Sequence, residues 1–348
     1  MSHAPIGALI VGAGLMGRAH AHAITASGGV VVGVVDPDPL RASALAGTSG
    51  RVPVFADVAS ALQATTPTVV HVCTPLPTHR AVIEAALHAD CHVIGEKPLT
   101  ATAPEAEALC ALAAARGRHL VPVHQFPFQQ GVGDLLAKHD ALGTIVHVEL
   151  TIASAGASGP RDADDVVAEI LPHCLSLTQV LLPTSHGDAS HGDASHGDAS
   201  LNGLPWQVTR VSPGEWRITA HANTASIAYL ISMSARPTCA ELRVFGTTAS
   251  AVVDLFHGYS VIDTGAVTRA SKAARPFRVA GRSMVAASAN LARRGLRAES
   301  AYPGLQALVH RAYLAFAGRG DVPISPRTLL DVARARDRLI ALSGWTAP

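Results

Sequence analysis

The chain has 348 residues, 48% hydrophobic and 15% charged, which is enough apolar sequence to fill the cores of about two domains. Its formal net charge is +1 and only 4% of its residues are aromatic, so a nucleic-acid-binding surface is not expected. The five scattered cysteines form no C-x-x-C pair, and the N-terminal apolar run is too short for a signal peptide or a membrane span. We therefore expect a cytoplasmic protein with reduced thiols and no membrane partner.

The first motif is a glycine-rich turn between an apolar run and an alanine-rich segment (residues 8–11, 12–17 and 18–26). This order predicts a strand, a tight turn and a helix. Gly12 permits the turn, Gly14 lets the backbone approach a pyrophosphate, and Gly17 lets the helix pack close to the strand. The phosphates would sit at the helix N-terminus, so Leu15 and Met16 are also candidate cofactor-binding residues.

An acidic residue follows at the distance that a dinucleotide site requires. Asp36 ends a second apolar run, residues 30–35, and stands 19 residues after Gly17. A carboxylate there accepts hydrogen bonds from the ribose hydroxyls of NAD and repels the 2′-phosphate of NADP. No arginine or lysine follows until Arg41. The sequence therefore favours NAD, with NADP as the alternative.

Apolar runs alternate with helical segments up to residue 124. Strands are predicted over 8–11, 30–35, 52–55, 68–73, 91–94 and 119–123, with helices over 18–26, 39–46, 58–64, 79–89 and 103–116. Asp57 and Thr78 are expected to cap two of these helices. The alternation predicts a doubly wound parallel sheet, that is, a Rossmann domain of residues 1–124.

Residues 125–348 have a different pattern, typical of an α+β domain. Helices are predicted over 128–139, 164–182, 304–317 and 327–342, and strands over 144–153, 207–211, 216–222, 226–233, 240–245 and 251–256. The strands alternate apolar and polar residues, which predicts an open, mostly antiparallel sheet. The last helix is a candidate for packing back on the Rossmann domain. An apolar set is expected on the outer face of the sheet, where it would make a homodimer or homotetramer: Ile218, Ala220, Ile227, Tyr229 and Ile231.

Two segments stand apart from these elements. His-Gly-Asp-Ala-Ser occurs three times over residues 186–200, and a surface loop is favoured there over a metal site, because five-residue spacing puts no two histidines on one helix face. Residues 272–297 are basic and partly apolar. A solvated flap or subunit-contact helix is favoured there over a membrane-surface helix or an anion site. No metal ligands are assigned.

The glycine turn, Cys73-Thr74-Pro75, His79 and Glu96-Lys97-Pro98 together resemble the glucose–fructose oxidoreductase/inositol dehydrogenase (Gfo/Idh/MocA) family. The likeness extends over nearly the whole chain. It implies an N-terminal dinucleotide-binding domain, a C-terminal sheet beside the substrate, and a catalytic Lys97. It also implies cofactor contacts from Thr74, Pro75, His79, Glu96 and Lys97.

The same resemblance implies an acidic residue and a histidine one turn apart on a helix of the second domain, facing the lysine. Here the pair is Glu169 and His173. The match departs from the family pattern, because Glu169 replaces the usual aspartate, Leu171 replaces a glycine and Pro172 precedes the histidine. His173 is therefore the candidate acid/base, and a catalytic role for Glu169 has less support.

These features imply an NAD(P)-dependent oxidoreductase that interconverts a secondary alcohol and a ketone on a sugar, cyclitol or related polyol. Two alternatives stay open: a reductase of imines or other carbonyls, and a non-catalytic dinucleotide-binding sensor. The presence of Lys97 and His173 argues against the sensor.

Overall fold

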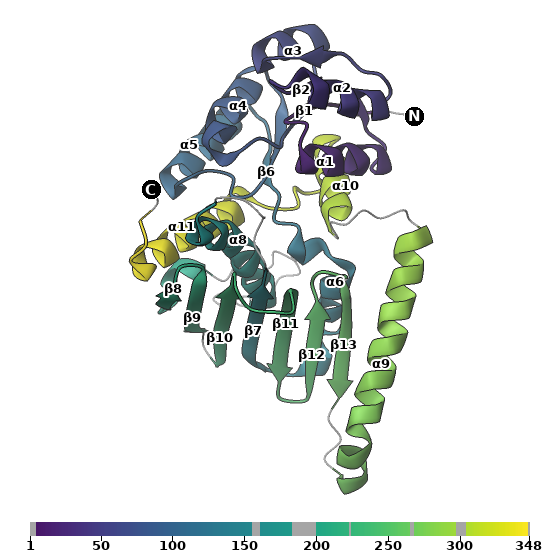
Figure 1. Ribbon diagram of the computed structural model, residues 1–348, viewed down its shortest axis with the longest axis vertical. Helices are drawn as coiled ribbons and strands as arrows, with labels where there is room; N and C mark the ends of the chain where they lie inside the picture. Colours follow the sequence, from purple (N-terminus) through teal and green to yellow (C-terminus); the bar gives the residue numbers. More distant parts are fainter. Residues whose placement is uncertain are drawn as a thin grey trace. The chain divides into compact units, whose positions relative to one another are not determined.

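The computed structural model describes residues 5–154, 161–182, 200–222, 224–264, 268–296 and 304–346. It divides the chain into two compact units (Figure 1), Met1–His124 with Leu305–Ala333 and Gln125–Gly304 with Arg334–Pro348. Each unit is built on one sheet. The tandem repeat of residues 186–200 lies, apart from its final Ser200, outside the described residues.

The first unit contains a parallel sheet of six strands in the order β3-β2-β1-β4-β5-β6. The strands are β1 (Gly7–Val11), β2 (Val30–Val35), β3 (Val54–Phe55), β4 (Val69–Val72), β5 (His92–Gly95) and β6 (Leu120–Pro122). Between them lie α1 (Leu15–Ala26), α2 (Pro39–Thr48), α3 (Val58–Thr65), α4 (Leu76–His88) and α5 (Ala103–Ala115). The predicted doubly wound Rossmann fold is thereby confirmed.

Two predicted helix caps had different outcomes. Asp57 caps α3, because its Oδ1 accepts a hydrogen bond of 2.9 Å from the backbone N–H three residues on. The predicted cap at Thr78 is wrong, since α4 already begins at Leu76. Pro77 is accommodated in the first turn, where a missing N–H leaves no helical bond unmade. The Thr78 hydroxyl instead donates to the carbonyl of Pro75 at 2.8 Å.

The chain returns to the first unit after completing most of the second. Helix α10 (Leu305–Phe316) packs beside α1 (Figure 1). A Cβ at Gly29 would lie 2.5 Å from the Tyr313 ring, so the glycine permits this close approach. Phe316 stacks on His92 with ring centroids 4.3 Å apart. The last helix, α11 (Pro326–Ser343), starts in the first unit and ends in the second.

The second unit contains a seven-stranded sheet in the order β13-β12-β11-β7-β10-β9-β8. The strands are β7 (Ile145–Ala153), β8 (Gln207–Ser212), β9 (Glu215–Ala222), β10 (Ala225–Ser232), β11 (Cys239–Gly246), β12 (Ala249–Asp254) and β13 (Tyr259–Thr264). Neighbours run antiparallel except β7 and β10, which are parallel. The mostly antiparallel sheet is therefore confirmed, although the sequence pattern did not predict β13.

The helix predicted over 128–139 is wrong in extent. The chain instead forms a short 3-10 turn (Phe126–Phe128), α6 (Gln130–Leu136) and α7 (His139–Leu142). Gln129 interrupts the helix with an extended backbone, and its side chain donates to the carbonyl of Leu255 at 2.9 Å. A Cβ at Gly131 would lie 2.6 Å from the backbone of Tyr259. We therefore attribute the interruption of the helix at Gln129 to contacts with the end of the sheet.

The apolar set expected on the outer face of the sheet lies on its inner face. Ile218, Ala220, Ile227, Tyr229 and Ile231 are all buried within this single chain. They lie on β9 and β10, and β10 contacts helix α8 (Ala163–Leu181) of the same unit. The Tyr229 and Thr178 hydroxyls are 2.5 Å apart. The pattern is thus explained by packing within the chain, and these residues give no support for an oligomer interface.

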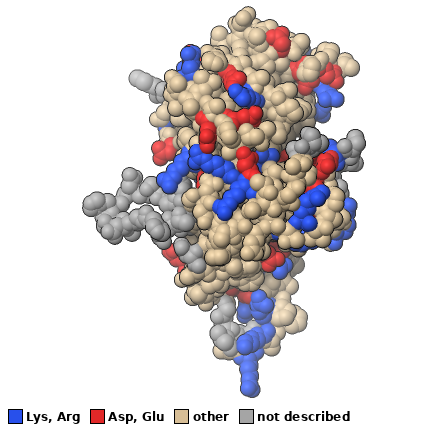
Figure 2. Space-filling model, turned by 90° about the vertical axis from the view of Figure 1, so that its left-hand side faces the viewer, with Lys and Arg blue, Asp and Glu red and all other residues tan. Residues whose placement is uncertain are grey.

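Residues 272–296 of the basic stretch belong to a long helix, α9 (Arg269–Leu296), along β13. Arg275, Arg278 and Arg282 surround the carboxylate of Asp263 on that strand, at 2.7, 3.5 and 3.8 Å. Figure 2 shows acidic and basic side chains mixed over the upper part of the face in view. None of the described helices has both the length and the apolar content needed to cross a bilayer.

Asp164 anchors the first turn of α8 to the sheet of the second unit. The buried carboxylate accepts hydrogen bonds from Arg210 Nη2 at 2.7 Å, from the Gly214 backbone N–H at 2.9 Å and from Trp216 Nε1 at 2.6 Å. Burial alone raises the pKa of Asp164, but these hydrogen bonds, led by the one from Arg210, outweigh it and hold the pKa below its usual value.

A depressed pKa of this kind contributes stability that is present above the unfolded-state value of about 3.9 and is lost as the pH falls through the folded-state value. We expect Asp164→Ala to lower the free energy of unfolding by about 3 kcal/mol at pH 7, because three donors lose their acceptor. The difference from the unchanged protein should shrink in acid. Denaturant unfolding at several pH values measures both effects, with the neighbouring Asp165→Ala as control. A loss no larger than the control's would contradict the expectation.

Candidate functional site

The glycine turn between β1 and α1 has the shape that a pyrophosphate requires. Gly12 has a φ of +101°, and a Cβ there would lie 2.6 Å from the carbonyl oxygen of Cys73. A Cβ at Gly17 would lie 2.0 Å from the carbonyl oxygen of Gly12. At Gly14, in contrast, no described residue apart from its own neighbours in the sequence comes within 4 Å of the Cβ position. The fold therefore needs glycine at positions 12 and 17. Gly14 leaves open space through which a phosphate can approach the backbone.

The start of α1 is suited to an anion. Leu15 is the first residue of the helix, and within the described residues no side chain caps this end. The first backbone N–H groups are consequently free of a helical partner and carry the positive end of the helix dipole. Leu15 is exposed and Met16 is half-buried. Both predicted residues can offer their backbone N–H groups to a phosphate.

Asp36 stands at the carboxyl end of β2, beside the glycine turn. Its Oδ2 accepts a hydrogen bond of 2.7 Å from the Ala13 backbone N–H, and its Oδ1 accepts one of 2.9 Å from Asp38. These bonds fix the carboxylate next to the turn. A carboxylate can accept about four hydrogen bonds, so acceptor capacity remains for the hydroxyls of a ribose.

His79 holds two loops of the site together. Its Nε2 lies 2.7 Å from the carbonyl oxygen of Thr74, and its Nδ1 lies 3.1 Å from that of Pro98 and 3.2 Å from that of Leu99. The ring is buried, and its two nitrogens face backbone acceptors on opposite sides. The side chain therefore braces the Thr74-Pro75 loop against the segment that follows Lys97.

Glu96 and Lys97 follow β5 at the carboxyl edge of the parallel sheet. The Glu96 side chain is buried, while Lys97 is half-buried. Glu96 Oε2 accepts a hydrogen bond of 3.2 Å from the Lys97 backbone N–H, and its Oε1 lies 3.1 Å from Nε2 of His20. The residue before the candidate catalytic lysine is thus tied both to the lysine and to helix α1.

His124, at the end of the neighbouring strand β6, is a site residue that the sequence did not single out. Burial lowers its pKa to about 4; Glu96 opposes the shift and Lys97 adds to it. The ring is therefore neutral near pH 7. Its Nδ1 has no hydrogen-bond partner among the described residues. The place of His124 after a strand end, in line with Lys97, is the signal that could have found it.

His173 lies in α8, in the second unit. Its buried ring stacks on Phe126 with centroids 4.1 Å apart and planes 7° from parallel. Glu169, one turn earlier, forms an ion pair with Arg161. The stacking fixes the plane of the imidazole, and the ion pair holds the carboxylate toward the N-terminal end of the helix.

Pro172, a departure from the family pattern, is compensated within α8. Proline has no N–H to donate to the carbonyl of Ala168, four residues earlier. Arg336 Nε of α11 donates to that carbonyl instead, at 3.0 Å. Burial lowers the pKa of Arg336, and the nearby charges of Asp337 and Glu169 oppose that shift. The helix therefore continues through Pro172 to His173 and beyond.

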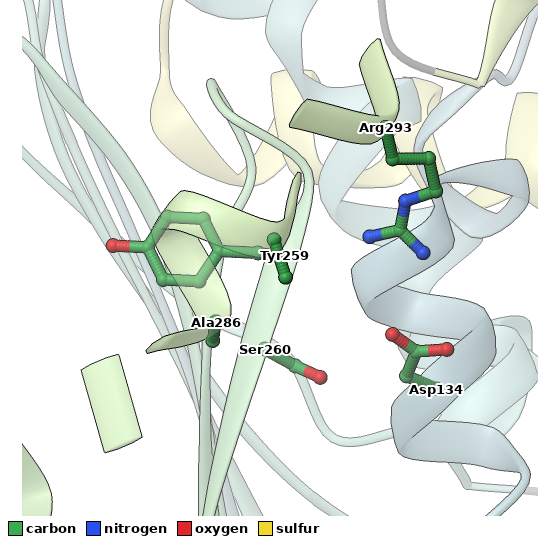
Figure 3. A pocket seen from close by; sticks show the side chains of 6 residues that line it. Asp134, Tyr259, Ser260, Ala286 and Arg293 are labelled. Carbon is green, nitrogen blue, oxygen red and sulfur yellow. The ribbon is translucent and has the colours of Figure 1, made fainter. Parts of the chain in front are cut away.

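One further groove lies within the second unit, of about 390 Å³, between α6, β13 and α9 (Figure 3). In it Arg293 and Asp134 point toward each other from opposite sides. None of the candidate catalytic or cofactor-binding residues lines this groove, but Ala286, Ala289 and Arg293 belong to the basic stretch of residues 272–297. Within the described residues, no group of three or more histidine, cysteine or acidic side chains is placed to hold a metal ion.

The fold and the glycine turn define a dinucleotide-binding protein of the Rossmann class. Residues 6–124 match the family model for the Gfo/Idh/MocA group, described as "Oxidoreductase family, NAD-binding Rossmann fold". Residues 6–124 are therefore similar to the NAD-binding Rossmann domain of the Gfo/Idh/MocA oxidoreductases.

Individual relatives show the same similarity. Inositol 2-dehydrogenase 1 of Saccharopolyspora erythraea is 37% identical over 115 residues, 32% of this chain and 34% of that protein. UDP-N-acetylglucosamine 3-dehydrogenase of Acidithiobacillus ferrooxidans is 31% identical over 179 residues, 49% of this chain and 53% of that protein. The matches thus span only about a third to a half of these relatives. The structure of a levoglucosan dehydrogenase shares the fold over 98% of both chains, with a TM-score of 0.74 and 16% identity.

The glycines give a matched pair of variants. A Cβ at Gly17 overlaps backbone, whereas one at Gly14 enters open space. We expect Gly17→Ala to lower the free energy of unfolding by about 3 kcal/mol, since the helix must move away from the turn. Gly14→Ala should fold normally but bind NAD at least about tenfold more weakly, because its methyl group occupies the space of a phosphate. Thermal unfolding and NAD titration separate the two effects. Equal stability losses in both variants would contradict this geometry.

Proposed function

We propose that the protein is an NAD-dependent dehydrogenase that interconverts a secondary alcohol and a ketone on a sugar, cyclitol or related polyol. The observation that carries the proposal is the position of Lys97 at the carboxyl edge of the parallel sheet. The lysine follows β5 directly, and a hydrogen bond to Glu96 and the His79 brace fix the backbone around it. Ligands of doubly wound sheets bind at this edge, so a cation there can reach a substrate oxygen.

Oxidation of an alcohol requires removal of a hydride from carbon and a proton from oxygen. NAD, when bound, supplies the hydride acceptor. The ammonium group of Lys97 can donate a hydrogen bond to the reacting oxygen and stabilise negative charge as it develops there. His173 has a side chain whose ordinary pKa is about 6.5, which suits a group that takes up and returns a proton near neutral pH. Its stacking on Phe126 limits the ring to one plane.

The relatives support the substrate class without selecting one substrate. Their names include an inositol dehydrogenase, a UDP-N-acetylglucosamine dehydrogenase and a levoglucosan dehydrogenase. These compounds have in common a secondary hydroxyl group on a six-membered ring. A panel of cyclitols, hexoses, anhydrosugars and nucleotide sugars, followed by absorbance of reduced nicotinamide, is therefore the direct test. An absence of turnover with the whole panel, combined with tight NAD binding, would favour a sensor.

Substitution of the two candidate groups tests the chemistry. We expect Lys97→Met and His173→Asn each to lower turnover at least about 100-fold, the lower end of a general acid–base contribution, with NAD affinity changed by less than about threefold. Lys138→Met, which removes an exposed lysine of the second unit, is the matched control and should keep normal turnover. Steady-state kinetics and NAD titration give both quantities. Near-normal turnover of Lys97→Met would remove the chemical basis of the proposal.

The preference for NAD over NADP depends on Asp36. We expect Asp36→Ala to raise the kcat/KM ratio of NADP to NAD at least about tenfold, because the variant loses hydrogen bonds to the free ribose hydroxyls and no longer repels a 2′-phosphate. Asp57→Ala removes a carboxylate that only caps α3 and should leave the ratio unchanged. Kinetics with both cofactors decide the matter. An unchanged ratio in Asp36→Ala would show that another group selects the cofactor.

A further inference from the structure

A chain of buried polar side chains runs through the first unit to the residue before Lys97. His20 of α1 and His71 of β4 are both fully buried, with their Nδ1 atoms 2.8 Å apart. His71 Nε2 lies 2.8 Å from the hydroxyl of Tyr313 on α10. His20 Nε2 lies 3.1 Å from Glu96 Oε1. The four side chains thus link four segments that are far apart in the sequence.

The hydrogen bonds of this network can all be donated in one direction, from Tyr313 toward Glu96. An ionised Glu96 only accepts hydrogen bonds, so His20 Nε2 must carry a hydrogen. Burial and the neighbouring His20 hold the pKa of His71 well below its usual value, so His71 is neutral. A neutral His71 carries one ring hydrogen; if its Nδ1–H donates to His20 Nδ1, then His71 Nε2 accepts from the hydroxyl of Tyr313. Every donor then points toward the carboxylate.

The series of hydrogen-bonded side chains ends at the backbone of the candidate catalytic lysine. Glu96 Oε1 is held by His20, and its Oε2 accepts from the Lys97 N–H at 3.2 Å. Ring geometry restricts the links before it, because the His20 and His71 rings meet edge to face at 85°, and the His71 and Tyr313 rings at 81°. A carboxylate fixed at both oxygens has one orientation, and the Lys97 backbone takes its position from it.

A metal centre does not explain this cluster. The two histidines contact each other through the same nitrogen, and the carboxylate lies at the opposite nitrogen of His20. No three ligating groups converge on one point anywhere in the described ranges. The cluster is therefore a hydrogen-bonded network.

We infer that His71 and Tyr313 are positioning residues, which hold Lys97 in its working position through His20 and Glu96. This inference rests on the proposed function only where it concerns turnover. The arrangement of the network and its hold on the lysine are separate properties that can be measured without a substrate. His71 is the central link, because among the described residues it is the one that contacts both His20 and Tyr313.

The chain offers a matched control in the next strand. His92 of β5 is also buried and also packs on α10, where it stacks on Phe316. Its Nδ1 accepts from the backbone N–H of His119 at 3.0 Å. Within the described residues, the hydrogen bond and the ring contacts of His92 lead to His119 and Phe316 and not to Glu96. His71→Val and His92→Val therefore remove similar buried rings, but only the first breaks the network.

Lysine NMR gives a direct reading of the position of Lys97. The sequence has three lysines, Lys97, Lys138 and Lys272, so ¹³C-dimethylated protein yields few signals. We expect His71→Val to shift the Lys97 signal while those of Lys138 and Lys272 stay in place, and His92→Val to shift none of them. Tyr313→Phe, which removes one hydroxyl and keeps the ring, should shift the Lys97 signal in the same direction by less. Tyr313→Phe also tests the inference if His71→Val fails to fold. An unmoved Lys97 signal in both network variants would overturn the inference.

Turnover and ring protonation complete the test. We expect His71→Val to lower kcat about 10- to 100-fold, as a displacement of about 1 Å at a reacting group does, with NAD affinity nearly unchanged and His92→Val close to normal. In ¹⁵N-histidine spectra at pH 8, His71 should carry its hydrogen on Nδ1 and His20 on Nε2. A doubly protonated His20, or His71 protonated on Nε2, would contradict the direction of the network. If the unchanged protein oxidises no substrate while the Lys97 signal still shifts, the proposed function fails and the positioning role stands.

Discussion

All strands of the parallel sheet in the first unit run the same way, so their carboxyl ends meet at one edge. The glycine turn follows β1, Asp36 follows β2, Thr74 comes after β4, Lys97 follows β5 and His124 follows β6. Residues separated by more than a hundred positions are thereby gathered along one line. The candidate chemistry of this unit depends on that constraint, because no single segment contains more than two of these groups.

Burial of polar groups adds precision to this edge. Burial of a polar side chain costs free energy unless the side chain finds a hydrogen-bond partner. Each buried polar side chain therefore restricts the positions of its neighbours. The two ring nitrogens of His79 lie 3.1 and 2.7 Å from carbonyl oxygens of the loops on its two sides. Glu96 is held by His20 and by the Lys97 backbone. The lysine can therefore keep one backbone position although its side chain is half-buried, and this is what a preorganised catalytic group needs.

In the second unit, His173 lies on a helix that contains a proline. Pro172 frees the carbonyl of Ala168, and Arg336 binds it from the last helix. Asp164, nine residues before His173, fixes the start of the helix to β9 through Trp216. His173 is thus positioned by contacts at both ends of α8 and by the ring of Phe126.

Local sequence determined the elements whose signals are local. Continuous apolar runs fixed the buried strands of the parallel sheet, the glycine turn fixed the junction of β1 and α1, and Asp57 fixed the start of α3. Partners far away in the chain decided the rest. Alternation in β9 and β10 shows that the sheet has an apolar face, but only packing against α8 shows that this face is internal. His71 interrupts an apolar run, and its partner Tyr313 lies 242 residues away. The carbonyl freed by Pro172 finds Arg336 across 168 residues. No local pattern contains such pairings, because they depend on which surfaces the completed sheets bring together.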